Sequence, residues 1–299
     1  MTASDRAGGA RALVTSAAPW VFVTLWSTGF IGAKYGLPYA EPMTFLALRF
    51  SIVTAAMAVV SLAAGARWPR SLAETLHIAV VGMLLQGTYL GGVFLALSKG
   101  VSAGLSALIA ALQPLLTAVL VRHLLGEQVR GLQWLGFVLG FVGVALVVGE
   151  KLSVDAGAFW AIVINVAALL GITFGTLYQK RFCAEMDLRS GTAIQNGTAA
   201  LMTFAGALTF EDRTIAWAPD FLFALTWLCL VLSVGATMLL FWLLRRGAAS
   251  RIASLFYLVA PTTALMAYFL FGETLAPSAM VGMGLAVAGV ALVVRGGGA

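Results

Sequence analysis

The hexapeptide GVALVV at residues 143–148 decides the fold, because the same six residues return unchanged at 289–294. Around this identity, residues 97–148 align with residues 244–294 at a shift of 147, which falls to 146 after one gap. A repeat of this length indicates that the chain contains one structural unit twice.

Individual residue pairs extend the repeat. The paired positions are Pro114 with Pro261, Glu127 with Glu273, Gly136 with Gly282, Lys34 with Lys180 and Gly29 with Gly175. The similarity weakens toward the N-terminal part of each copy, where single pairs stay in register.

The composition excludes a water-soluble protein. The 299 residues are 61% hydrophobic and 10% charged, with a mean hydropathy of +0.98, whereas an ordinary soluble domain is roughly 25% charged. An integral membrane protein is indicated, and the net charge of +6 needs no nucleic-acid partner. Cys183 and Cys229 form no CxxC motif, which argues against a disulfide framework or a zinc site.

Charged residues divide the chain into stretches of membrane-spanning length. A helix needs about 20 apolar residues to cross the hydrocarbon core. The stretches are 12–33, 42–66, 75–98, 100–121, 131–149, 156–179, 190–210, 221–244, 252–272 and 274–294. Only the second contains a charge, Arg49, for which we expect a structural role, either snorkelling to the interface or pairing with a carbonyl. The fold class predicted is an all-α integral membrane protein of ten transmembrane helices.

Lysine and arginine residues orient the helices. With the N-terminus in the cytoplasm, thirteen of them lie inside and four outside, which the positive-inside rule favours. We therefore expect a bacterial inner (plasma) membrane protein with both termini cytoplasmic. Its parts are a cytoplasmic tail at 1–15, a first repeat at 16–150 (helices 1–5), a second repeat at 151–295 (helices 6–10) and a tail at 296–299.

Five helices per repeat is an odd number, so the second copy must enter the bilayer inverted. Inverted repeats place a binding site near the midplane and allow two related gates to open alternately. This organisation predicts a transporter. No paired intramembrane carboxylates, HExxH motif or activated nucleophile indicates an enzyme, a cofactor or a bound metal.

Several of these residues also resemble a known family. The stretch Leu25-Trp-Ser-Thr-Gly29, the helices with Pro114 and Pro261, and the two Gly-Glu turns are similar to the EamA-type members of the drug/metabolite transporter superfamily. The chain further resembles YddG-type exporters of aromatic amino acids. The resemblance implies a central cavity surrounded by helices 1, 3, 4, 6, 8 and 9, with helices 5 and 10 at the periphery.

Polar and aromatic side chains inside the spans are candidates for a substrate pathway, because polar groups there usually face protein or water. The candidates are Trp26, Gln86, Tyr89, Phe94, Gln113, Asn165, Tyr178, Thr237, Phe241, Trp242 and Tyr257. Interhelical hydrogen bonding is the alternative role for them. Pro114 and Pro261 should kink their helices, either as paired hinges or as fixed curvature.

The spans contain no Asp or Glu, which argues against carboxylate-based proton antiport and against a cationic substrate. We therefore expect an alternating-access exporter of amino acids, aromatic ones above all, or of similar neutral or zwitterionic metabolites. The alternative is transport of phosphorylated sugars or nucleotide-sugars through Lys99, Arg245 and Arg246, although the two arginines also fit as inside-positive anchors. Glycine rows on helices 5 and 10 predict packing of these helices within a monomer, with a dimer interface as the alternative.

Overall fold

The computed structural model describes residues 3–117, 120, 131–154, 158–236, 239, 242–243, 249–273 and 277–296. The helices are α1 (Ala3–Gly36), α2 (Pro42–Ala63), α3 (Leu72–Gly82), η1 (Met83–Leu90), α4 (Gly91–Ser98), α5 (Ala103–Ala110), α7 (Gly131–Val154), α8 (Ala158–Phe182), α9 (Leu188–Phe210), α10 (Pro219–Thr226), η2 (Trp227–Ala236), α12 (Ala249–Phe271) and α13 (Pro277–Gly296). Each of the ten predicted stretches contains helix in these residues, so the predicted all-helical membrane fold is confirmed.

Two of the spans are built from more than one segment. The third span joins α3, η1 and α4 into one continuous helix, and the eighth begins with α10 and η2. By length and apolar composition, three described helices can cross a membrane, namely Pro42–Ala63, Leu72–Ser98 and Ala158–Phe182. Shorter apolar helices in the described residues are Ala103–Thr117, Trp134–Gly149, Pro219–Ser233, Leu258–Phe271 and Pro277–Gly289.

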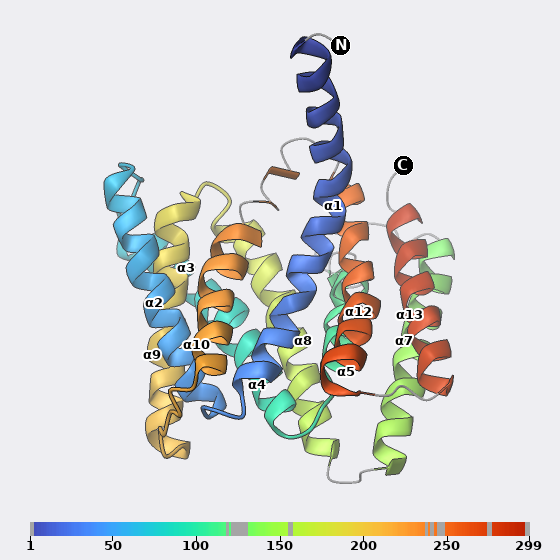
Figure 1. The fold of residues 1–299 in the computed structure, drawn as a ribbon. Helices are drawn as coiled ribbons and strands as arrows, with labels where there is room; N and C mark the ends of the chain where they lie inside the picture. Colours follow the sequence, from blue (N-terminus) through green and yellow to red (C-terminus); the bar gives the residue numbers. More distant parts are fainter. Residues whose placement is uncertain are drawn as a thin grey trace.

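Repeat-related helices pair at the two edges of the molecule (Figure 1). The second helix of each copy, α2 and α9, forms one edge, and the fifth helix of each copy, α7 and α13, forms the other. Between them lie α1, α5, α8 and α12. This pairing is the arrangement expected when two copies of one unit are related by inversion.

Glycine allows α7 and α13 to approach closely. A Cβ added at Gly143 would meet the Gly282 carbonyl, and a Cβ added at Gly289 would meet the Gly136 carbonyl and the Gly140 backbone. Small residues at this spacing bring helix backbones together without lipid between them. The glycine rows therefore face each other within one chain, as predicted.

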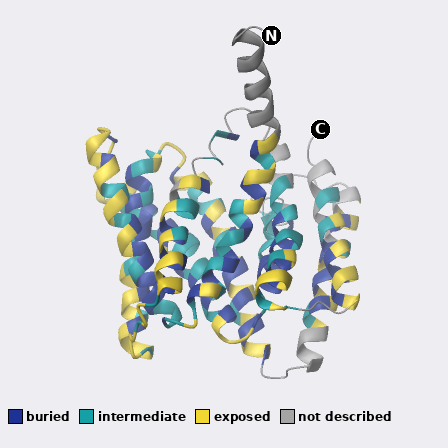
Figure 2. Ribbon diagram, in the orientation of Figure 1, coloured by how far each residue is buried: buried dark blue, intermediate teal, exposed yellow. Residues whose placement is uncertain are grey.

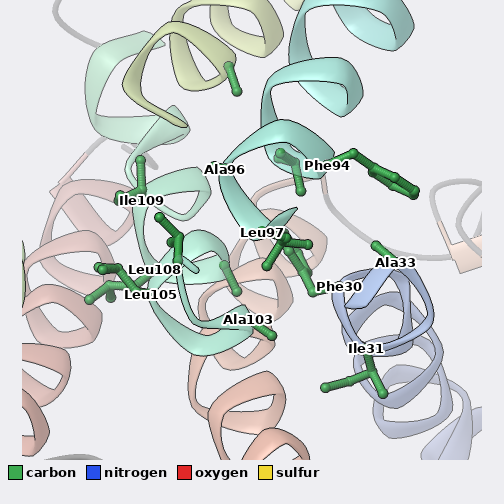
Figure 3. Close-up of a cluster of buried hydrophobic side chains, with 14 of the residues drawn as sticks. Phe30, Ile31, Ala33, Phe94, Ala96, Leu97, Ala103, Leu105, Leu108 and Ile109 are labelled. Atoms are coloured by element: carbon green, nitrogen blue, oxygen red, sulfur yellow. The ribbon is translucent and has the colours of Figure 1, made fainter. Parts of the chain in front are cut away.

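Apolar side chains cover the outer surface. Exposed residues run along the outward sides of the edge helices (Figure 2), and they include Leu62, Leu201, Phe210 and Met280. The interior is also apolar, as where Phe30 of α1 packs with Leu97 of α4 and the residues that begin α5 (Figure 3). An apolar exterior of this kind suits a hydrocarbon environment.

Candidate functional site

The third and eighth spans both widen in the middle. η1 and η2 are π-helical, and a shift of 147 maps Met83–Leu90 of η1 onto residues 230–237, which overlap η2. In η2 the Ser233 hydroxyl donates to the Leu228 carbonyl five residues earlier, at 2.9 Å. π-helical turns are uncommon and frequently mark functional sites. Both repeats thus carry a π-helical segment at overlapping repeat positions.

A polar line connects α5 with α8. The Ser106 hydroxyl donates to Asn165 Oδ1 at 3.3 Å, and Asn165 is 1% exposed. Beyond the end of α5, Gln113 Nε2 donates to Oγ1 of the exposed Thr176 at 3.0 Å. Asn165 Nδ2 is buried and has no hydrogen-bond partner among the residues that the structure describes. A buried amide donor without a partner is costly, so this group is available to a bound molecule.

Aromatic rings join α1 to α12. Three rings contact one another, and the centroids of any two of them are 5.3 Å apart. They belong to Phe22, Trp26 and Phe256. Nearby, the Ser27 hydroxyl contacts the Val259 carbonyl at 3.3 Å. Trp242 is partly buried and packs against the same cluster. Two of the predicted aromatic candidates, Trp26 and Trp242, are therefore brought together.

The remaining described candidates are dispersed. Gln86 and Tyr89 are half-buried on η1. Phe94 is 1% exposed and packs edge-to-face on Phe45, with centroids 5.3 Å apart, which places it in the apolar core. The Tyr178 hydroxyl lies 2.7 Å from His77 Nδ1, near the end of α8. Thr237 and Phe241, together with the Tyr257 side chain, lie outside the described residues.

The helix is interrupted next to Pro114 but is continuous through Pro261. α5 ends at Ala110, a turn follows at 111–112, and helix resumes at 113–117 around Pro114. Within this turn the Leu112 N–H donates to the Ile109 carbonyl, only three residues back, at 3.1 Å. Proline lacks an N–H and clashes with the preceding turn, which explains the interruption. In the second copy, by contrast, α12 continues as one helix through Pro261.

The basic candidates do not gather in the described part of the chain. Lys99 is exposed and caps the C-terminal end of α4, whereas Arg245 and Arg246 lie outside the described residues. Arg49, expected to be structural, is 4% exposed, and its guanidinium donates to the Ser233 hydroxyl at 3.4 Å. Among the described residues its side chain therefore bonds to a hydroxyl rather than to a carbonyl, and it is buried rather than extended to the surface. Its position as the one charge within a predicted span was the signal in the sequence.

An ion pair closes one end of the bundle. Lys34, in the last turn of α1, pairs with Glu273, which follows α12. The same carboxylate accepts the Ala103 N–H of α5 at 3.2 Å. Elements of both repeats are thereby held together at this end.

Comparisons with known proteins also indicate a membrane transporter. The sequence profile of the EamA-like transporter family matches residues 17–149 and 157–295. The "Uncharacterized inner membrane transporter YedA" of Escherichia coli K12 is 24% identical over 273 residues, covering 91% of this chain and 88% of that protein. The "Uncharacterized transporter YvbV" of Bacillus subtilis is 26% identical over 287 residues, covering 91% and 88%.

A third relative, a "Probable amino-acid metabolite efflux pump" of Salmonella typhimurium, is 24% identical over 283 residues and covers 92% of each chain. One solved crystal structure shares the fold, with a TM-score of 0.65, 21% identity, and coverage of 92% of this chain and 94% of the other. The chain therefore belongs to the EamA-like transporter family and is a multi-pass membrane transporter, not an enzyme.

Proposed function

We propose that the protein exports zwitterionic amino acids, aromatic ones above all, across the bacterial inner membrane by alternating access. The observation that carries the proposal is the buried, uncharged Ser106–Asn165 pair between α5 and α8, in which the Asn165 Nδ2 donor has no partner among the described residues. A cavity of amides and hydroxyls suits a solute without net charge. The names of two enterobacterial relatives, each a "Probable amino-acid metabolite efflux pump", agree with this substrate class.

Four features of the described structure have a role in this proposal: the aromatic cluster, Asn165, the two π-helical segments and the Lys34–Glu273 ion pair. Trp26 and its aromatic neighbours offer ring faces and edges to an aromatic side chain. Asn165 donates to a substrate oxygen, and the widened η1 and η2 segments let the helices that surround the pathway change their packing. In this proposal both termini are cytoplasmic, so the end joined by Lys34 and Glu273 faces outward and forms part of the outer gate.

The experiment is transport into proteoliposomes that contain only the purified protein. Labelled phenylalanine, glutamate and a sugar phosphate are offered with and without a pH gradient. We expect phenylalanine to move without the gradient, because the spans contain no carboxylate to carry a coupled proton. Movement of the sugar phosphate alone would overturn the substrate class and favour the alternative through Lys99, Arg245 and Arg246.

A pair of matched variants tests the polar line. Asn165→Ala should lower phenylalanine transport by about tenfold, the loss expected for one hydrogen bond to a charged group. Asn196→Ala is the control, because Asn196 is equally buried but donates to the Thr192 carbonyl of its own helix at 2.9 Å. Equal transport by the two variants would contradict a role for Asn165 in binding.

A further inference from the structure

Arg49 is a buried, charged side chain in a helix long enough to cross a membrane. It lies seven residues after Pro42, the first residue of α2, or about 10 Å along the helix axis at 1.5 Å per residue. Its residue is 4% exposed, and the ten predicted spans contain no other charged residue. Burying an ion is costly unless an opposite charge or several hydrogen bonds compensate it.

The described neighbours of Arg49 supply little compensation. Its Nη2 donates to Ser233 Oγ at 3.4 Å, and its Nε is buried without a hydrogen-bond partner in the described part of the chain. The Phe50 ring lies 5.9 Å from the guanidinium carbon, and the Tyr89 and Cys229 side chains are close enough to interact electrostatically. All of these neighbours are uncharged, whereas a guanidinium has five N–H donors.

A protein carboxylate does not balance this charge in the described part of the chain. The ion pairs there are Lys34 with Glu273 and Arg189 with Asp187, neither of which involves Arg49. The sequence adds that no predicted span holds an Asp or Glu. The positive charge at this depth therefore lacks a counter-ion among the described residues.

The position of Arg49 connects it with the substrate pathway. Ser233 belongs to η2, which packs against α2, and Tyr89, an electrostatic neighbour of Arg49, belongs to the end of η1. Ser233 is the repeat equivalent of Gln86, a predicted pathway residue, at a shift of 147. The repeat equivalent of Arg49, at a shift of 146, is the buried but uncharged Gln195 of α9. The packing of α2 against α9 therefore does not itself require a cation at this position.

We propose that Arg49 binds the carboxylate of the transported solute. A planar guanidinium can donate two parallel N–H bonds to a carboxylate, which is the geometry this pair of groups prefers. One cation among neutral groups balances one negative charge, which suits a carboxylate better than a doubly charged phosphate. This inference rests on the proposed export of amino acids and names the chemical group that the site recognises.

The experiment compares purified wild-type protein with Arg49→Met and Arg49→Lys. The probes are L-phenylalanine, 3-phenylpropionate, which keeps the carboxylate without the amine, and phenethylamine, which keeps the amine without the carboxylate. Binding is measured from the dependence of the thermal unfolding midpoint on ligand concentration. Wild type should bind the two carboxylates and not phenethylamine. Arg49→Met should weaken carboxylate binding by at least about tenfold, with Arg49→Lys in between.

Stability without ligand separates a binding role from a structural one. Methionine removes an uncompensated buried charge, so unliganded Arg49→Met should unfold at the same temperature as wild type or higher. The control is Arg189→Met, which breaks an ion pair outside the spans and should lower the unliganded midpoint without changing carboxylate binding. Loss of unliganded stability in Arg49→Met, with carboxylate binding unchanged, would overturn the proposal.

Two results distinguish this inference from the proposed function. If wild type neither transports nor binds phenylalanine, yet 3-phenylpropionate stabilises wild type and not Arg49→Met, the carboxylate site stands and amino-acid export does not. If wild type transports phenylalanine and Arg49→Met transports it equally well, export stands and the carboxylate site is overturned.

Discussion

The Lys34 ammonium and the Glu273 carboxylate, from opposite ends of the chain, form an ion pair at one end of the bundle. Because Glu273 also accepts the Ala103 N–H, this carboxylate links α1, α5 and the end of α12. The repeat equivalent of Lys34 is Lys180, which is exposed in the last turn of α8. Of these two repeat-related lysines, Lys34 therefore forms an ion pair, whereas Lys180 is exposed.

Removing the charge of Glu273 should loosen this end. In a background with Ala33→Cys, a buried position near the ion pair, Glu273→Gln should raise the rate of labelling by a maleimide. The expected increase is about twofold to fivefold, because a partly solvated ion pair contributes up to about 1 kcal/mol. Cys183 and Cys229 are both buried, so the parent protein supplies the baseline.

The matched control for this measurement is Glu74→Gln. Glu74 accepts the Arg70 N–H at 2.8 Å at the start of α3, away from the ion pair. This variant should leave labelling of the introduced cysteine unchanged. An equal increase in both variants would show general loosening of the protein rather than opening at Lys34 and Glu273.

The contact between α7 and α13 should tolerate no added methyl group. Gly282→Ala places a Cβ against the Gly143 carbonyl, and such overpacking costs about 1–3 kcal/mol. Gly284→Ala, two residues along the same helix, meets nothing within 4 Å and should stabilise the helix by up to about 1 kcal/mol. Thermal unfolding in detergent measures both variants, and a Gly282→Ala midpoint at or above wild type would argue against the close contact.

Asp187 should make stability depend on pH. Its carboxylate, just before α9, accepts an N–H of the Arg189 guanidinium at 2.8 Å, and this interaction holds the pKa of Asp187 well below its ordinary value of 3.8. A depressed folded-state pKa contributes stability that is fully present above the unfolded-state pKa. That stability is lost as the pH falls below about 3.8 toward the folded-state pKa.

Asp187→Asn tests this dependence. Asparagine keeps a good N-cap for α9 while removing the charge, so it should lower stability near pH 7 by less than about 1 kcal/mol, since the pair is partly solvated. Measured from pH 7 to pH 3, the difference in unfolding midpoint between wild type and variant should shrink only at the acid end. A difference that stays constant to pH 3 would be inconsistent with this ion pair.

The two prolines should differ in their effect on transport. Pro114→Ala restores an N–H next to the interruption after α5 and should change the transport rate more than Pro261→Ala, since α12 is already continuous. A shift of about 1 kcal/mol between two packings would change the rate about fivefold. Pro277→Ala is the control, because Pro277 is the first residue of α13, where proline fits a helix. Unchanged transport at normal expression in the first two variants would contradict a hinge role.

The sequence alone determined the helices and their duplication. Apolar stretches of about 20 residues have one stable conformation in a bilayer, because backbone groups there must bond within their own helix. The residues shared by 143–148 and 289–294 then identified the repeat, and five helices per copy required inversion. Spacing also predicted the facing glycine rows of α7 and α13, since small residues on one face have a single strong packing solution.

The partners of polar side chains were decided only by the tertiary structure. Three such pairs join residues that are 59 to 239 positions apart in the sequence. They are Ser106 with Asn165, Lys34 with Glu273, and Arg49 with Ser233. A helical period identifies which face a residue occupies, but not which neighbouring helix that face meets. Phe94 illustrates this limit, because its face met Phe45 and became part of the core.

The surroundings of Arg49 were likewise decided by the neighbouring helices and not by its own segment. As a sequence feature it was one arginine near the end of an apolar stretch, a position from which long side chains usually reach the interface. The structure instead buries the guanidinium next to Ser233 of η2, where its Nε has no partner among the described residues. Local sequence determines how a segment folds, whereas the compensation of a buried charge is decided by what the other helices bring to it.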